Sequence, residues 1–230
     1  MPFELPIFPL GVVLFPGMPL PLHIFESRYR LMIGRALQSD KTFGVAQIIE
    51  GQEGAPNTWP ASIGTTAEIL EVTPFADGRM NVQTVGVRRF RILSVREEDE
   101  YIVAQCEWVD DDDAQHGLSR LAMGTRQALS RYFDALALNS DSAAEGADLD
   151  VPQDAQSLSM FIAAILQLPL QQKQELLEMT DTRARLEIED FLLQRATIIH
   201  LAFAKRTANG EATTTGDASL GPMSGFVSLN

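Results

Sequence analysis

The hydrophobic pattern of this chain changes period once, near residue 110, and this change constrains the fold more than any other feature. Before it, short β-branched and aromatic runs alternate with turn residues, a pattern that is typical of strands. After it, apolar residues recur about every 3.6 positions, as in helices. The 230 residues therefore predict an α+β protein, with a β subdomain over residues 1–113 and a helical subdomain over residues 114–206.

The first part predicts seven short strands and one helix, an arrangement that suits a closed or nearly closed barrel. Asp77-Gly78, between two of the strands, is a hairpin-turn signal. The helix begins near Glu26 or Ser27, and the Ser27 hydroxyl can cap it. The predicted strands are Phe3–Phe8, Leu20–Phe25, Thr42–Glu50, Gly64–Pro74, Arg79–Val87, Phe90–Arg96 and Tyr101–Val109.

The two strand runs that meet at Arg88-Arg89 differ in phase. Val85 and Val87 share one face, whereas Phe90 and Ile92 have the opposite parity. Keeping both pairs inside the barrel requires a slip of one residue, so we expect a β-bulge or a sharp bend at Arg88-Arg89.

The second part predicts four helices, over residues 115–138, 155–167, 170–179 and 181–206, with Thr180 or Asp181 capping the last. The acidic run Asp110–Asp113 and the acidic stretch 139–154 are typical of solvated connectors. Residues 207–230 contain no Lys or Arg and few apolar side chains. The conformational entropy lost on ordering these residues outweighs the free energy gained by burying their apolar side chains, so we expect a disordered tail.

Charge and composition exclude several classes of protein. The formal charge of −13 argues against broad nucleic-acid binding, which depends on basic side chains. Cys106 is the only cysteine, which rules out an intramolecular disulfide and suits a reducing compartment. No Lys or Arg precedes Arg28, and no apolar run approaches the ~18 residues of a membrane span. The sequence therefore predicts a cytoplasmic protein without a secretory leader.

Residues that could carry catalysis are sparse. The sequence holds neither a Gly-x-x-x-x-Gly-Lys-Ser/Thr loop nor a His-Glu-x-x-His helix, and His23, His116 and His200 are far apart along the chain. We expect no cofactor and no metal. Ser224 lacks the Gly-x-Ser-x-Gly spacing of a nucleophile elbow, but with His200 it is the nearest approach to a nucleophile and base. It represents the enzymatic alternative, a stand-alone hydrolase or peptidase.

A cluster of arginines represents another alternative, an RNA-binding module. The neighbouring carboxylates Glu97, Glu98, Asp99 and Glu100 cancel most of its field, and no exposed aromatic pair for base stacking is evident. We therefore favour a charged strand face paired with those carboxylates. The arginines are Arg79, Arg88, Arg89, Arg91 and Arg96.

Prolines dominate the opening segment, where they remove hydrogen-bond donors and keep each extended piece short. The chain must step between these pieces around a common core. The residues expected in this core are Ile7, Leu10, Val13, Leu14, Leu20, Leu22 and Phe25.

This opening segment resembles the amino-terminal domain of Lon-type ATP-dependent proteases. The resemblance continues through the strands and into the helical part, and covers about residues 2–205. The motifs that carry it are Phe8-Pro9-Leu10, Leu14-Phe15-Pro16-Gly17, Leu20-Pro21-Leu22-x-Ile24-Phe25-Glu26-x-Arg28-Tyr29, Gly44-Val45, Gly64-Thr65-x-Ala67-Glu68-Ile69, Gly86-x-Arg88-Arg89-Phe90-Arg91-Ile92, Tyr101-x-Val103-Ala104 and Lys173–Glu187.

The resemblance implies a PUA-like pseudo-β-barrel with one inserted helix, followed by a C-terminal helical bundle. It also implies a non-catalytic module that binds unfolded or extended polypeptides. The ATPase loop and the serine-lysine protease domain of full-length Lon are missing from the sequence. We therefore expect a free-standing member that acts as an adaptor or chaperone-like factor, with a separate protease or chaperone as its partner.

The expected binding mode is an extended peptide added to an exposed barrel edge, with apolar side chains in a groove between barrel and helices. Core packing is the alternative role for Phe15 and Phe25, although a Leu-Phe-Pro-Gly turn should expose Phe15. The tail segment Gly225–Asn230 is a further candidate to occupy the groove. The predicted contacts are Phe15, Pro16, Phe25, Tyr29 and Met32.

Overall fold

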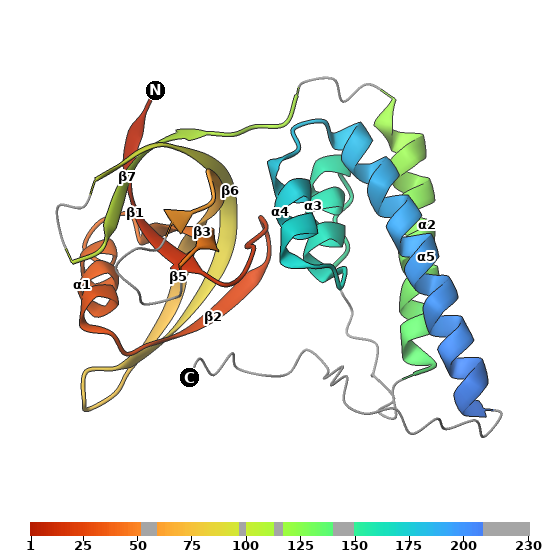
Figure 1. Cartoon of the computed structure of the whole chain (residues 1–230), viewed down its shortest axis with the longest axis horizontal. Helices are drawn as coiled ribbons and strands as arrows, with labels where there is room; N and C mark the ends of the chain where they lie inside the picture. The colour runs from red at the N-terminus through yellow and green to blue at the C-terminus, as the bar shows by residue number, and fades with distance from the viewer. Residues whose placement is uncertain (52–58, 97–99, 113–116, 140–149, 209–230) are drawn as a thin grey trace. The chain divides into compact units, whose positions relative to one another are not determined.

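The computed structural model describes residues 1–51, 59–96, 100–112, 117–139 and 150–208, coloured along the chain in Figure 1. These form two compact units. The first comprises Met1–Asp111 and Ala163–Thr180, and the second comprises Asp112–Ile162 and, as far as described, residues 181–208. Nearly all of the predicted tail and most of the acidic stretch 139–154 lie outside the described residues. The subdomain boundary at 113/114 stays a prediction.

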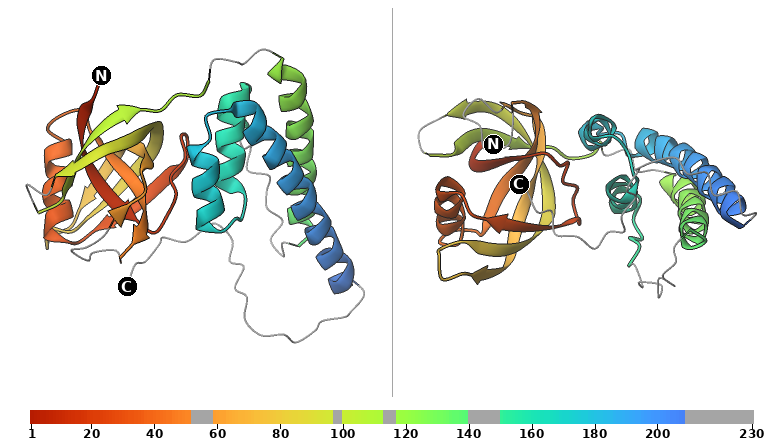
Figure 2. Two further views of the ribbon diagram at one scale, coloured as in Figure 1. Left: turned by 45° about the horizontal axis from the view of Figure 1, so that its top comes forward. Right: turned by 60° about the horizontal axis from the view of Figure 1, so that its bottom comes forward.

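The strands of the first unit form one sheet that closes on itself (Figure 2). β1 pairs antiparallel with β7 and parallel with β3, which completes the ring β1-β7-β6-β5-β3. β2 adds to β6, and β4 adds to β3. The α+β class is confirmed. The elements are β1 (Phe3–Leu10), β2 (Pro19–Ile24), α1 (Ser27–Ala36), β3 (Thr42–Glu50), β4 (Trp59–Pro60), β5 (Ile63–Pro74), β6 (Met80–Arg96) and β7 (Ile102–Trp108).

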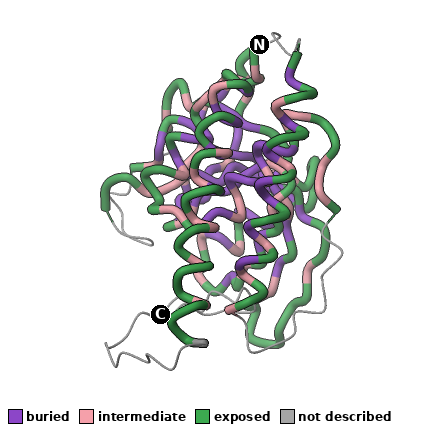
Figure 3. Tube along the Cα trace, turned by 90° about the vertical axis from the view of Figure 1, so that its right-hand side faces the viewer, coloured by how far each residue is buried: buried purple, intermediate pink, exposed green. Residues whose placement is uncertain are grey.

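The core of the first unit combines the inward strand residues with one face of α1. Tyr29, Met32, Ile33 and Ala36 repeat at helical spacing and pack on buried strand residues. Buried positions, purple in Figure 3, alternate with exposed ones along the chain. The predicted core residues Ile7, Leu10, Val13, Leu14 and Leu20 are buried and Leu22 is partly buried.

Two predictions near the start of α1 are wrong. Phe25 is 48% exposed and is not part of the core, because it follows the last residue of β2 and lies outside the sheet pairing. Ser27 is the first residue of α1 rather than its cap. Glu26 occupies the N-cap position, but its carboxylate accepts from the Arg28 side chain and makes no capping hydrogen bond to a backbone amide of the helix.

The region predicted as two strands around Arg88-Arg89 is one continuous strand, β6. A register irregularity is present there, since three steps from Gly86 to Arg89 oppose two steps from Ala67 to Thr65. The sequence predicted this irregularity as a way to keep both Val85 and Val87 inside the barrel. That reason is wrong, because Val87 is 48% exposed. The irregularity instead turns Arg88 outward while Arg89 and Phe90 are both buried.

Two local predictions are confirmed. Asp77-Gly78 forms the β5–β6 hairpin turn, in which Gly78 has a φ of 85° and the Phe75 amide donates to the Arg79 carbonyl at 2.8 Å. Asp181 caps the last helix, since its Oδ1 accepts a hydrogen bond from the Ala184 amide at 3.1 Å.

The described helices after β7 are divided between the two units. In the second unit, α2 packs against α5, and Arg185 Nε donates to Ser159 Oγ at 2.6 Å while Ser159 Oγ donates to Glu189 at 3.0 Å. All three of these residues are fully buried. Within the described residues, no helix combines the length and apolar character needed to cross a bilayer. The helices are α2 (Leu118–Ala137), α3 (Ala155–Ile165), α4 (Leu170–Glu178) and α5 (Thr182–Ala208).

Candidate functional site

The five predicted peptide contacts do not form one surface. Phe15, Tyr29 and Met32 are at most 5% exposed, so a ligand could reach them only if the barrel opened. The turn at Leu14–Gly17 points Phe15 inward because its backbone lies along β6, where Gly17 donates to the Gly86 carbonyl at 2.8 Å. Pro16 is half-buried and Phe25 is exposed.

An open pocket lies elsewhere in the first unit and has a volume of about 610 Å³. Its walls are largely apolar, and exposed side chains contribute to them: Ile49, Trp59 and Leu93 are 64%, 58% and 49% exposed. Such a pocket is typical of a binding site for apolar side chains. The lining residues are Ile49, Trp59, Pro60, Ala61, Ser62, Ile92, Leu93, Ser94, Val95, Gln174 and Glu178.

Two incompletely paired strands border this pocket. β5 begins at Ile63, opposite Arg91, so β6 continues beyond the start of its neighbour. Among the described residues, strand pairing of residues 94–96 is with β7 alone, and that of β4 is with β3 alone, while Leu93 is the extra residue of an irregularity between Ile92 and Ser94. A strand edge beside an apolar pocket can accept an extended peptide through main-chain hydrogen bonds.

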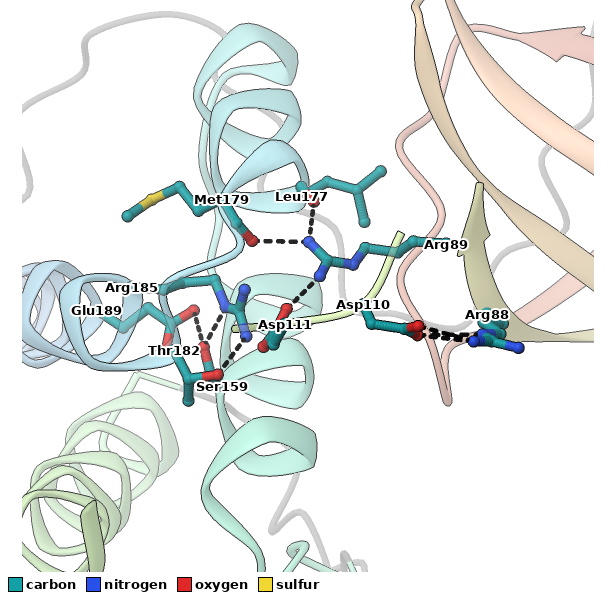
Figure 4. A network of polar contacts seen from close by, with 10 residues as sticks. All are labelled: Arg88, Arg89, Asp110, Asp111, Ser159, Leu177, Met179, Thr182, Arg185 and Glu189. Atoms are coloured by element: carbon teal, nitrogen blue, oxygen red, sulfur yellow. Dashed lines mark hydrogen bonds and ion pairs between the residues drawn. The ribbon is translucent and has the colours of Figure 1, made fainter. Parts of the chain in front are cut away.

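Helix α4 supplies the polar wall of the pocket and is held against the barrel by buried side chains. Gln174 is 7% exposed and its Nε2 donates to the Ile63 carbonyl at 2.9 Å. Arg89 Nη1 donates to the carbonyls of Leu177 and Met179 at 2.6 and 2.7 Å (Figure 4). These bonds satisfy carbonyls at the C-terminal end of α4, where helix carbonyls lack intrahelical partners. Gln174 and Glu178 thereby keep a fixed position at the pocket.

Burial also perturbs a basic group on α4. Lys173 Nζ donates to the Ala164 carbonyl at 2.8 Å, and desolvation by burial lowers the pKa of the Lys173 ammonium. This bond joins α4 to the end of α3 within the first unit. It therefore contributes to holding the helix that carries Gln174 and Glu178.

The arginine cluster is paired, as the charged-face interpretation predicts, but the described partners differ from those expected. Arg79 pairs with Asp77, Arg88 with Asp110, Arg91 with Glu107 and Arg96 with Glu4. Glu97, Glu98 and Asp99 lie outside the described residues. These pairs neutralise much of the basic surface that RNA binding would need.

Asp111 corrects the interpretation of Asp110–Asp113 as a solvated connector. Its side chain is 1% exposed and pairs with Arg89, whose side chain is 2% exposed (Figure 4). The connector begins as part of the barrel because the buried guanidinium needs a compensating charge. Asp110 remains exposed, and Asp113 lies outside the described residues.

The groups that could act as nucleophiles or metal ligands do not converge in the described parts. Cys106 is fully buried, and desolvation raises the pKa of its thiol to about 12, so it is protonated at neutral pH. His23 Nδ1 lies 2.7 Å from Asn81 Oδ1, and His200 packs edge-on to Tyr132. No three potential metal ligands lie together among the residues described. His116 lies outside the described residues, and so does Ser224, which is the nucleophile in the enzymatic alternative.

The pocket residues were missed by the sequence predictions. Trp59 and Leu93 are separated in sequence from each other and from α4, and only the strand register brings them together. One local sequence feature could have pointed to the pocket. Trp59-Pro60 is an aromatic-proline pair outside the predicted strands, and an exposed aromatic residue of this kind often marks a binding surface.

Comparison with known proteins places these observations in one family. The family model described as the ATP-dependent protease La (LON) substrate-binding domain matches residues 4–195. Lon protease of Escherichia coli (strain K12) is 28% identical over 187 residues, which are 80% of this chain and 24% of that protein. Lon protease 2 of Myxococcus xanthus is 28% identical over 198 residues, 85% of this chain and 24% of that protein.

Solved structures show the same similarity. The Lon N-terminal domain protein from Xanthomonas campestris has a TM-score of 0.58 and 28% identity, over 81% of this chain and 96% of that one. The N-terminal domain of Mycobacterium avium complex Lon protease has a TM-score of 0.62 at 21% identity, over 83% of this chain and 98% of that one, and supports the fold alone. The chain spans about a quarter of the length of the Lon proteases that it matches.

Proposed function

The chain belongs to the ATP-dependent protease La (LON) substrate-binding domain family, and from that membership we propose that it is a non-catalytic module that binds unfolded or extended polypeptides. An extended segment would add to the free edge of β6, and its apolar side chains would enter the pocket beside α4. The observation that carries this proposal is the apolar pocket next to an incompletely paired strand edge.

This binding mode suits a receptor for many different unfolded chains. Main-chain hydrogen bonds to a strand edge do not depend on the sequence of the peptide, whereas an apolar pocket adds a preference for segments that are buried in folded proteins. Because the pocket is open, it can accept side chains of different size. Affinity for any one segment would be moderate, since the peptide loses conformational freedom on binding.

We further propose that the module works in the cytoplasm as an adaptor or chaperone-like factor, with a separate protease or chaperone as its partner. In this proposal the strand ring is PUA-like and the helices form the predicted C-terminal bundle. Support comes from the relatives, which are Lon proteases and so motivate a role in proteolysis. The 230 residues themselves contain no phosphate-binding ATPase loop.

Titration of a fluorescently labelled, reduced and alkylated model protein tests the binding function by anisotropy. Leu93→Ser removes an apolar wall of the pocket and should weaken binding about tenfold, the effect of losing ~1.4 kcal/mol of contact. Leu70→Ser is the matched control, because Leu70 is a 63% exposed strand leucine that does not line the pocket. Phe25→Ser tests the predicted contact at Phe25, which stays a separate proposal.

Three outcomes separate these ideas. Weaker binding by the Leu93 variant alone supports the pocket. Loss confined to the Phe25 variant transfers the site to the surface around Phe25. The absence of saturable binding by the unmodified protein would reject the binding function itself.

A further inference from the structure

One acidic side chain gives the pocket its charge. Glu178 is the only charged residue among the described residues that line it. It is exposed and forms no ion pair within the described parts of the chain. It is also the last residue of α4, where the negative end of the helix dipole disfavours a carboxylate and favours a cation.

The Glu178 carboxylate is held in place by a buried neighbour. Gln174 Nε2 donates to Glu178 Oε1 at 2.8 Å and to the Ile63 carbonyl at 2.9 Å. Because Gln174 is 7% exposed, its amide is fixed by the barrel and fixes the carboxylate in turn. Gln174 Oε1 is buried and has no hydrogen-bond partner in the described residues. Both features describe a polar site that is preorganised rather than freely solvated.

The rest of the pocket suits the stem of a basic side chain. Lys and Arg carry long aliphatic stems that pack on apolar surface while the charged head stays at a polar rim. Ile49 and Leu93 provide apolar surface, and the exposed indole of Trp59 can attract a cation through its ring face. A carboxylate, an indole and aliphatic walls in one pocket are complementary to a basic residue.

We propose that this pocket selects extended segments in which a Lys or Arg lies among apolar residues, and that Glu178 binds the basic head group. The inference rests on the proposed polypeptide-binding function and names the substrate class of the same site. Apolar neighbours in the segment would supply most of the contact area, and the Glu178 ion pair would supply the selectivity.

Two labelled decapeptides test the selectivity. They share an apolar sequence and differ only in a central lysine, which is free in one and Nε-acetylated in the other, so the stem is kept while the charge is removed. The unmodified protein should bind the lysine peptide about tenfold more tightly, as measured by anisotropy at physiological salt. Glu178→Gln should reduce this preference to less than about twofold while leaving affinity for the acetylated peptide nearly unchanged.

Glu175→Gln is the matched control, because Glu175 lies on the same helix, is exposed, and does not line the pocket. It changes the net charge by the same amount and should keep the preference. Charge reversal by Glu178→Lys should make a central glutamate peptide the better ligand.

Each outcome distinguishes the selectivity from the underlying function. Equal affinity of the unmodified protein for the two peptides would overturn the proposed selectivity and leave polypeptide binding standing. Equal loss of preference in the Glu175 and Glu178 variants would assign it to overall charge and also overturn the role of Glu178. If neither peptide binds saturably, and the unfolded model protein does not bind either, both proposals fail.

Discussion

Arg88 and Arg89 are adjacent in the sequence but lie in opposite environments. Arg88 makes an exposed, bidentate pair with Asp110, with side chains 46% and 68% exposed. Arg89 is buried with Asp111 and also binds two carbonyls at the end of α4. The register irregularity between Gly86 and Arg89 produces this difference, because it lets two successive residues, Arg89 and Phe90, be buried.

The two arginines should therefore differ in their contribution to stability. Arg89→Ala leaves the Asp111 carboxylate buried without this partner and removes the donor to two carbonyls, so we expect a loss of about 3–5 kcal/mol in the free energy of unfolding. Arg88→Ala removes an exposed pair, which is worth about 0–1 kcal/mol. Urea denaturation followed by far-UV circular dichroism measures both. Similar losses of unfolding free energy in the two variants would contradict the burial of Arg89 and the exposure of Arg88.

Residue chemistry alone could predict that these arginines are paired, but it could not identify the partners. The sequence suggested carboxylates close to them along the chain, at residues 97–100. Among the described residues, the strand register brings Arg96 to Glu4 and Arg91 to Glu107, and most of the suggested carboxylates lie outside the described residues. The burial of Phe15 could not be predicted either, because the local sequence Leu-Phe-Pro-Gly does not show that the segment is bonded to β6 with its phenylalanine buried.

At the scale of elements, Gly86 lets the opening segment lie directly on β6. Its amide donates to the Met18 carbonyl at 2.9 Å, and its carbonyl accepts from Gly17. A Cβ at this position would overlap the Phe15 carbonyl oxygen and approach Leu14. Since backbone atoms cannot move aside as easily as side chains, a larger residue must displace the segment.

Gly86→Ala should therefore destabilise the barrel by about 1–3 kcal/mol. Gly124→Ala provides the matched control, because Gly124 lies within α2 and a Cβ there meets nothing within 4 Å. That substitution should stabilise the protein by roughly 0.5–1 kcal/mol, since alanine is the better helix former. Thermal unfolding of both variants shows whether each substitution raises or lowers stability. A Gly86 variant with unchanged stability would show that the opening segment does not pack tightly on β6.

Strands and helices were predictable from the sequence because each has its own hydrophobic period, and most predicted elements are present within a few residues of their expected bounds. β4 was not predicted, since a two-residue strand has no period to detect. The continuity of β6 was also missed. Its phase change suggested two strands, whereas a bulge accommodates one extra residue without ending the pairing.

At the scale of the whole molecule, the important arrangement is that α4 belongs to the same compact unit as the strands. Its hydrophobic period assigns it to the helical part of the sequence, but its hydrogen bonds to Ile63 and Arg89 join it to the barrel. Local pattern cannot reveal which of two units a short amphipathic helix will join. A groove between barrel and helices was expected from the resemblance, but the residues that line the pocket could not be named, because they come together only where α4 meets the barrel.

A fragment of residues 1–113 contains all of the described strands but lacks α4, and we expect it to be less stable than the full chain by at least about 3 kcal/mol. The fragment lacks the buried side chains of Leu176 and Leu177 and leaves Arg89 without two acceptors. Trp59 and Trp108 both lie within the fragment, so the urea midpoint of tryptophan fluorescence reports on the barrel in either protein. Leu177→Ala in the full chain is a milder test of the same contribution, and we expect it to lower the free energy of unfolding by about 2–5 kcal/mol. A fragment with the midpoint of the full chain would show that the barrel folds without α4, and that a boundary at 113/114 divides independent parts.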